Sequence, residues 1–164
     1  MNWKVVAGFV LALLAALPAQ AGDLNVTILG VRSYAGALMI GLYDNAVRFK
    51  NGIVTATHIG LLKDKGRLVG VTMRARTGSQ SVGFRQLPPG PYAVIVFHDE
   101  NDNGILDEDL LGIPTEGYGF SNNATGFFSA PSFDAAAVTV GTLDMNISIT
   151  LIYQGAPVKR PVVK

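Results

Sequence analysis

An acidic segment near the middle of the chain, residues 99–109, carries the side chains with the clearest chemistry. Oxygen-bearing side chains fall on every second residue there, and a glycine follows them at position 104. Alternate side chains of a tight loop converge on one point, and the glycine permits the sharp turn that a calcium loop makes around its ion. The candidate Ca²⁺ ligands are the side chains of Asp99, Asn101, Asn103 and Asp107 and the carbonyl oxygen of Ile105.

This segment differs from a helix-flanked EF-hand. The twelfth position, where an EF-hand has a bidentate glutamate, is Leu110 here. We therefore predict a strand-flanked loop whose shell is completed by Asp109 or Glu116, or by the Asn122–Asn123 pair. Two asparagine ligands lower the charge of the site, so we expect weak affinity, roughly 10⁻⁴ M. The alternative is a turn rich in Asp and Asn that binds no metal, because both residue types cap turns by themselves.

An aromatic and glycine-rich segment follows between residues 117 and 133. Its side chains could form a stacking surface for a sugar or a peptide, and the candidate contacts are Tyr118, Phe120, Asn122 and Phe127. The alternative, which we favour, is that the segment folds back and covers an open end of the fold with its own aromatic rings.

The sequence gives little indication of a catalytic site. The two histidines, His58 and His98, are far apart in the sequence, whereas a zinc site needs three or four clustered ligands. The chain contains neither a Gly-x-Ser-x-Gly elbow nor a phosphate-binding glycine loop. A hydrolase would require two of Asp99, Asp107 and Glu116 to converge beside His98 on an open cleft. This is the least favoured class, and we expect a protein that is not an enzyme.

The first 21 residues are typical of a secretory signal peptide. Lys4 precedes the apolar run 5–17, which is too short to cross a bilayer, and Ala19-Gln20-Ala21 has the small-x-small pattern of a cleavage site. We expect cleavage after Ala21 and a periplasmic or secreted mature protein that has no transmembrane segment.

Composition narrows the possible partners. The chain has no cysteine, which excludes disulfides, thiol catalysis and lipid attachment through a thiol. Its formal net charge is +1, without the basic excess or stripe of a nucleic-acid-binding protein. We therefore expect a partner in the cell envelope, a protein or a glycan, and no nucleic acid.

Seven short segments of the chain have strand character. They alternate apolar and polar residues or form short apolar runs, and Gly, Pro and Asn turns separate them. They are residues 24–30, 37–43, 67–76, 81–87, 92–97, 137–142 and 146–153. We predict one all-β domain over residues 22–153, an antiparallel sandwich of about seven strands with an immunoglobulin-like or transthyretin-like arrangement. Residues 154–164 would be a disordered tail.

Two segments interrupt the strand pattern. Residues 44–57 could form one short helix that Asp44 or Asn45 caps and Gly52 ends. The connection 99–132 is long for a compact domain, and such loops are usually functional or are held by something other than packing.

Three stretches of the chain closely resemble a family of exported bacterial domains, domain of unknown function 2141. These stretches are Gly90–Val94, His98–Asp107 and Gly112–Asn123, and residues 131–133 and 149–153 fit as well. The resemblance covers most of residues 23–153. It implies a small secreted or periplasmic β-sandwich and supplies no activity.

A second resemblance lies at the level of fold. The Gly-x-Tyr strand followed by an Asp/Asn-Gly turn looks like transthyretin-like and carboxypeptidase-regulatory sandwiches. Those implied relatives are mostly binding, spacer or stability modules, and a likeness of fold does not by itself assign a function. The combined expectation is a non-enzymatic, calcium-stabilised binding or structural module.

Overall fold

The computed structural model describes residues 21–63, 65–127 and 129–154, so the expected signal peptide up to residue 20 and the tail from residue 155 lie outside it. The described residues are mostly β. Their strands are β1 (Gly22–Val31), β2 (Ala37–Tyr43), β3 (Val69–Arg74), β4 (Gly78–Leu87), β5 (Gly90–Asp99), β6 (Gly117–Phe120), β7 (Val138–Val140) and β8 (Met145–Thr150). Their helices are α1 (Ala46–His58), η1 (Leu61–Lys63), η2 (Ser121–Asn123) and α2 (Phe133–Ala136).

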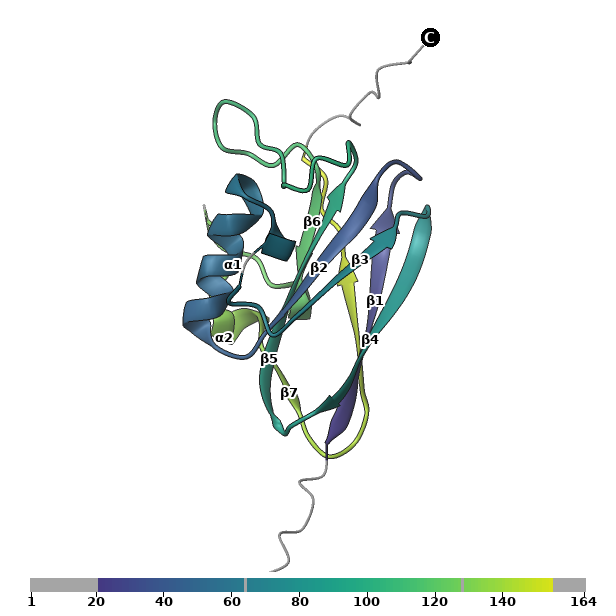
Figure 1. Cartoon of the computed structure of the whole chain (residues 1–164), viewed down its shortest axis with the longest axis vertical. Helices are drawn as coiled ribbons and strands as arrows, with labels where there is room; N and C mark the ends of the chain where they lie inside the picture. Colours follow the sequence, from purple (N-terminus) through teal and green to yellow (C-terminus); the bar gives the residue numbers. More distant parts are fainter. Residues whose placement is uncertain (1–20, 64, 128, 155–164) are drawn as a thin grey trace, which may run out of the picture.

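The strands form two sheets (Figure 1). One sheet has the order β4-β1-β8, and the other has the order β3-β2-β5-β6, with β7 paired to the start of β5. Every strand pair is antiparallel except β1 with β8, which is parallel. The prediction of a wholly antiparallel arrangement is therefore wrong for this pair. The chain reaches β8 beside the start of β1, where Asp23 N donates to Asp144 Oδ1, and then runs in the same direction as β1.

A hydrophobic core lies between the two sheets. Strand β1 alternates as its sequence predicted, with Leu24, Val26 and Ile28 fully buried and the residues between them partly exposed. Buried side chains of β2, β5 and β8 meet them in the same cluster. Burial of each such side chain is worth about 1.5–3 kcal/mol, so this cluster is a main source of stability.

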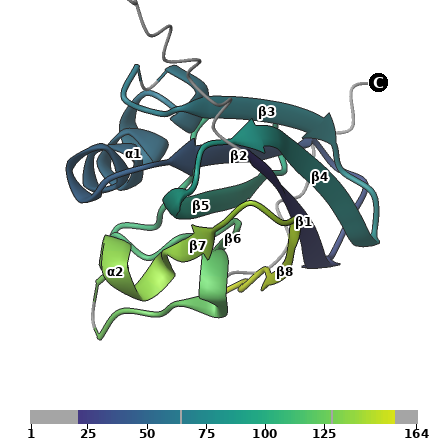
Figure 2. The same ribbon diagram turned by 90° about the horizontal axis from the view of Figure 1, so that it is seen from below.

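Strand β5 is buried on both faces. Tyr92, Val94 and Val96 face the core between the sheets, whereas Ile95 and Phe97 belong to a second cluster under the helices. Helices α1 and α2 cover this outer face, and Figures 1 and 2 show both helices on the side opposite β4. The continuous apolar run in β5 therefore reflects a central strand between two apolar layers.

Helix α1 begins as the sequence predicted and ends later. Asn45 is its N-cap and accepts a hydrogen bond from Arg48 N at 3.0 Å, but Gly52 lies inside the helix and does not end it. A Cβ at position 52 would lie 2.3 Å from the Cζ of the buried Tyr43 ring. A glycine is thus needed at position 52 for packing against Tyr43, although in the sequence it looks like the end of a helix.

Strand β6 was missed by the sequence prediction because half of its residues are glycines, which weaken a strand pattern. A Cβ on Gly117 would lie 2.3 Å from the Tyr153 ring, and a Cβ on Gly119 would lie 2.7 Å from Ile149 Cγ2. Both glycines let β6 approach the end of the chain closely. The connection 99–132 is consequently not a free loop, since it contains β6 and η2.

We predict that Gly52→Ala destabilises the protein by about 1–3 kcal/mol, because the added methyl group overlaps the immobile Tyr43 ring. Helix propensity alone predicts the opposite sign. Urea unfolding of the variant measures the change. Asn51→Ala, at the neighbouring exposed helix position, is the control and should be neutral or slightly stabilising. An increase in stability for Gly52→Ala would contradict the packing argument.

Candidate functional site

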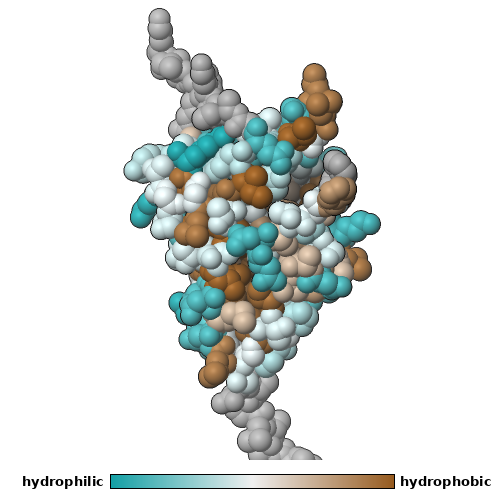
Figure 3. Space-filling view, turned by 180° about the vertical axis from the view of Figure 1, so that it is seen from behind, coloured by the Kyte–Doolittle hydropathy of each residue, from teal (hydrophilic) through white to brown (hydrophobic). Residues whose placement is uncertain are grey.

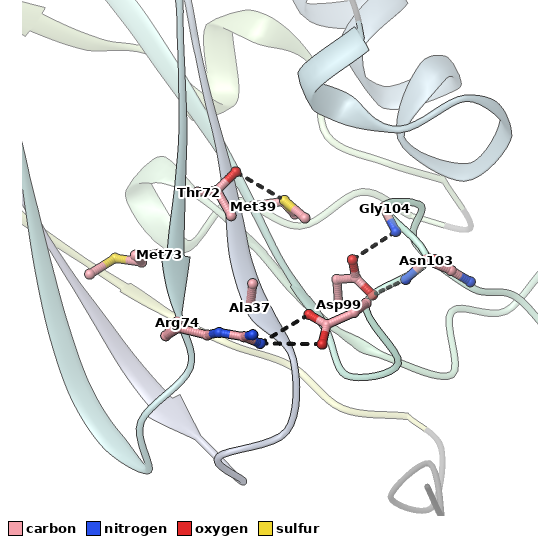
Figure 4. Close-up of a pocket in the computed structure, with 9 residues that line it drawn as sticks. Ala37, Met39, Thr72, Met73, Arg74, Asp99, Asn103 and Gly104 are labelled. Atoms are coloured by element: carbon pink, nitrogen blue, oxygen red, sulfur yellow. Dashed lines mark hydrogen bonds and ion pairs between the residues drawn. The ribbon is translucent and has the colours of Figure 1, made fainter. Parts of the chain in front are cut away.

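The acidic loop leaves the end of β5 and turns around Asp99. The Asp99 side chain is buried, and its carboxylate accepts hydrogen bonds from Asn103 N at 3.1 Å and Gly104 N at 2.8 Å (Figure 4). Gly104 has a φ of 83°, a conformation that glycine adopts without strain. Asp99 therefore fixes the turn that the sequence predicted at Gly104.

The other predicted side-chain ligands gather in the same turn. Asn101 Nδ2 donates to Asp107 Oδ2 at 2.6 Å, and Asn103 Nδ2 donates to Asp107 Oδ1 at 3.0 Å. The amide oxygens of Asn101 and Asn103 accept from the backbone nitrogens of Asn103 and Ile105. The loop thus brings Asn101, Asn103 and Asp107 together. Their side-chain oxygen and nitrogen atoms form hydrogen bonds within the loop.

The two candidates for completing the shell lie in different places. Asp109 Oδ1 accepts from Leu111 N at 2.8 Å and Ile113 N at 3.0 Å, so its carboxylate caps the next turn. Glu116 is fully buried, and its carboxylate accepts from Glu100 N at 2.7 Å and from Asp107 N at 3.2 Å. Of these two side chains, only that of Glu116 bonds the part of the acidic loop that holds the other candidate ligands.

Several carboxylates of this region have no positively charged partner to balance their negative charge. Burial raises the pKa of Glu116 to about 7, with a further contribution from the charges of Asp107 and Asp99. Burial also raises the pKa of Asp99. Among the described residues, the ion pairs of this region join Arg32 to Glu100 and Arg74 to Asp102, and none includes Asp99, Asp107 or Glu116.

The donor set of the loop fits a hard cation in its chemistry. All of its ligand atoms are oxygens, from carboxylates, amides and one backbone carbonyl, which is what Ca²⁺ prefers. In the described part of the chain, however, no group of three or more His, Cys, Asp or Glu side chains is placed to hold a metal ion. Any site here therefore depends on the amides of Asn101 and Asn103.

A buried polar network lies behind the loop, and the sequence analysis missed it. Arg32 Nε donates to Glu100 Oε1 at 3.0 Å, the Arg32 Nη2 group also bonds this carboxylate, and Ser33 Oγ donates to it at 2.9 Å. Burial favours the protonated acid, but the bonds from Arg32 and Ser33 hold the pKa of Glu100 below its usual value. The Arg32 guanidinium also stacks 4.2 Å above the Tyr153 ring.

His98 is part of this network. Its Nε2 lies 2.8 Å from the carbonyl oxygen of Ala35 and its Nδ1 lies 2.8 Å from the Tyr153 hydroxyl. A carbonyl only accepts, so Nε2 carries the proton of the first bond. Burial raises the pKa of Tyr153 to about 12. Both ring nitrogens of His98 are thus engaged inside the protein, where a substrate could not reach them.

A shallow recess of about 360 Å³ lies between the acidic loop and strands β2 and β3 (Figure 4). Asp99 and Asp102 border it, and the Arg74 side chain extends along it towards the loop. The residues bordering it include no histidine, and Glu116 and Asp107 are not among them. The convergence that a hydrolase would require is therefore not found at this recess.

A larger cleft of about 770 Å³ lies on the outer face of the β5–β6 region. Its walls are α1 and residues of the segments 106–114, 124–126 and 129–131, and Tyr118 and Phe120 line it. The other two predicted contacts do not. Asn122 Nδ2 donates to the carbonyl oxygens of Ala135 and Ala137, and Phe127 is exposed outside the cleft.

The Asn123 side chain also forms hydrogen bonds that hold the fold together. Its Oδ1 accepts from Thr150 N at 2.7 Å and its Nδ2 donates to Ser148 O at 3.4 Å, along the free edge of β8. Asn122 and Asn123 both have positive φ values, 59° and 49°, which asparagine tolerates better than most residues. The side-chain hydrogen bonds of the Asn122–Asn123 pair therefore go to backbone groups at β8 and α2 and not to the acidic loop.

A family model described as an uncharacterized protein conserved in bacteria (DUF2141) matches residues 26–148. The chain belongs to this family, as the resemblance of its residues 90–94, 98–107 and 112–123 predicted. No curated protein and no solved structure matches the chain significantly. In the described residues, no helix has the length and apolar character needed to cross a membrane.

We predict that Arg32→Ala destabilises the protein by about 3–5 kcal/mol, because it leaves the buried Glu100 carboxylate without its cation. The matched control is Arg74→Ala, which breaks the exposed pair with Asp102 and should cost less than about 1 kcal/mol. Urea unfolding of both variants compares them. Equal losses of unfolding free energy in the two variants would show that burial does not make the Arg32–Glu100 pair more important for stability than the exposed pair.

The raised pKa of Glu116 predicts a pH-dependent stability in the presence of chelator. The folded protein holds this proton more tightly than the unfolded chain, so the stabilisation is complete below about pH 4.5 and is lost as the pH rises through about 7. The melting temperature should therefore fall between pH 5 and pH 8. Glu116→Gln should reduce that fall, whereas Glu108→Gln, at an exposed position, should keep it. An unchanged pH response in Glu116→Gln would refute the assignment.

Proposed function

We propose that this protein is an exported, non-enzymatic module of the cell envelope that calcium stabilises. In this proposal the two sheets form a β-sandwich of the immunoglobulin-like or transthyretin-like kind, and the export assignment rests on the signal-peptide pattern of residues 1–21. The observation that carries the calcium assignment is the gathering of Asp99, Asn101, Asn103 and Asp107 in one turn.

Electrostatics support a cation in this place. The charges of Asp107 and Asp99 both raise the pKa of the buried Glu116, and among the described residues none of these three carboxylates has an ion-pair partner. Like charges repel one another more strongly where burial reduces the screening by water. A bound Ca²⁺ would remove that repulsion. Asp99, Asn101, Asn103, Asp107 and the Ile105 carbonyl would hold it, and Glu116 would support the shell from behind.

The acidic loop also fixes a wall of the larger cleft. Leu106 lies between two ligand positions, its backbone nitrogen donates to Ala56 O of α1 at 2.8 Å, and its side chain lines the cleft. An ion that orders the loop would therefore order this wall. This connection supports a binding role for the module in addition to a structural one.

A sugar or peptide partner, bound through the aromatic segment, is the second candidate. The position of Tyr118 and Phe120 in the cleft favours binding at this place. Asn122 and Phe127 contribute elsewhere, so the four residues do not form one surface. Fluorescence titration of the protein with envelope glycans and peptides tests this candidate.

For the calcium proposal we expect saturable binding to a protein that begins at Gly22, measured by titration calorimetry, with a Kd of roughly 10⁻⁴ M. At about 1 mM calcium such a site stabilises the fold by about 1.4 kcal/mol. The melting temperature should then rise by about 3–6 °C relative to chelator. The variant Asp107→Asn should lose both effects.

Two further variants sharpen this test. Asp109→Asn changes the carboxylate that caps the next turn, so it should retain calcium binding. Asp134→Asn, on the remote helix α2, is the control for a general loss of negative charge. Identical melting temperatures of the unmodified protein in calcium and in chelator would support the metal-free turn instead.

A further inference from the structure

The larger cleft is an apolar site on a rigid floor. Ile95 and Phe97 of β5 and Tyr118 and Phe120 of β6 line it, and each belongs to the second hydrophobic cluster or packs against it. Helix α1 forms one wall through residues 53–58. A volume of about 770 Å³ is within the range of sites that bind small molecules, which are mostly apolar with a few polar groups.

The charge of the lining excludes one class of ligand. Among the described residues that line the cleft there is no lysine or arginine, and the titratable side chains are those of Glu108, His58 and Tyr118. An acidic head group would therefore enter without a cationic partner and beside a carboxylate. A ligand without net negative charge fits the lining better.

The backbone of the floor excludes a second class. Strand β5 is paired with β2 on one side and β6 on the other, and the second edge of β6 is closed by two hydrogen bonds between Tyr118 and Ile152, at 3.0 and 2.8 Å. An extended peptide would find no free strand edge at the floor for its own backbone groups. A helical peptide is about 10 Å wide and takes roughly 420 Å³ per turn, so the cleft holds fewer than two turns.

Two leucines lie exposed at the tip of the loop that borders the cleft. Leu110 and Leu111 are consecutive, their side chains are exposed, and Leu111 also lines the cleft. Figure 3 shows apolar side chains at the tip of this projecting loop, on the upper right. Neighbouring exposed apolar side chains are a feature of surfaces that contact membranes or other apolar phases.

We propose that the cleft binds the hydrocarbon chain of a lipid whose head group carries no net negative charge. The hydrocarbon chain lies over Tyr118 and Phe120, and the head group remains at the open rim near Glu108. The Leu110–Leu111 tip contacts the apolar phase that supplies the lipid. This inference goes beyond the calcium-stabilised module and holds with or without a bound metal.

The first experiment uses a protein that begins at Gly22 and the apolar fluorophore N-phenyl-1-naphthylamine. We expect saturable binding with an increase in fluorescence, in chelator as well as in calcium. Monopalmitoylglycerol should displace the fluorophore. Palmitate, which has the same chain and an anionic head, should be at least tenfold weaker at pH 8. Equal displacement by both lipids would overturn the head-group assignment, and displacement only by apolar peptides would overturn the lipid assignment.

The second experiment locates the site with a matched pair on helix α1. Val54 lines the cleft and is 54% exposed, whereas Val47 is 72% exposed and is not among the lining residues. Val54→Trp should fill the cleft and weaken binding of the fluorophore at least tenfold, and Val47→Trp should leave it unchanged. Thr125→Trp, on the opposite wall, is a second filling variant if Val54→Trp does not fold. Equal affinities in cleft-filling and control variants would place the fluorophore elsewhere and overturn the proposal.

The tryptophan variants also report the ligand directly. The only tryptophan of the chain is Trp3, so a protein that begins at Gly22 has none and each variant carries a single indole. Leu111→Trp should show a blue shift of its emission with monopalmitoylglycerol, and Val47→Trp should not. A calcium titration of the same samples separates the two proposals, because the lipid proposal expects saturable binding in chelator as well.

Discussion

The burial of strand β5 on both of its faces is the constraint on which the rest of the structure depends. Its even-numbered apolar residues close the core between the sheets, and Ile95 and Phe97 carry the layer of helices. The same strand runs directly into Asp99 and also forms the floor of the cleft. One segment therefore positions the acidic loop and the apolar cleft, so both are attached to a strand that is buried on its two faces.

Polar groups at the end of β5 are satisfied within the fold. Glu116 accepts from the backbone nitrogens of Glu100 and Asp107, and so ties the two ends of the acidic loop to the start of β6. Glu100 is neutralised by Arg32, and His98 is held between Ala35 and Tyr153. Because a buried polar group without a partner is costly, this arrangement holds the two ends of the loop in place.

The sequence predicted local features well and long-range ones poorly. Alternation in β1, the apolar run of β5 and the cap at Asn45 depend on neighbouring residues, and the structure confirms them. The roles of Gly52 and Gly117 depend on rings at Tyr43 and Tyr153, which no local pattern reveals. Arg32 was likewise missed, because its partner Glu100 is 68 residues away. The parallel pairing of β1 with β8 was also missed, since the alternation of apolar and polar residues carries no information on strand direction.

Asn123 places an amide where the next strand of the sheet would otherwise lie. With its oxygen on Thr150 N and its nitrogen on Ser148 O, the side chain imitates the peptide group of a neighbouring chain. A strand with free backbone groups can recruit a second molecule and start intermolecular polymerisation. At this border the Asn123 side chain contributes protection that other proteins obtain from a bulge or a proline. An exchange to aspartate would keep the acceptor for Thr150 N and remove the donor, so Ser148 O at this border would lose its partner.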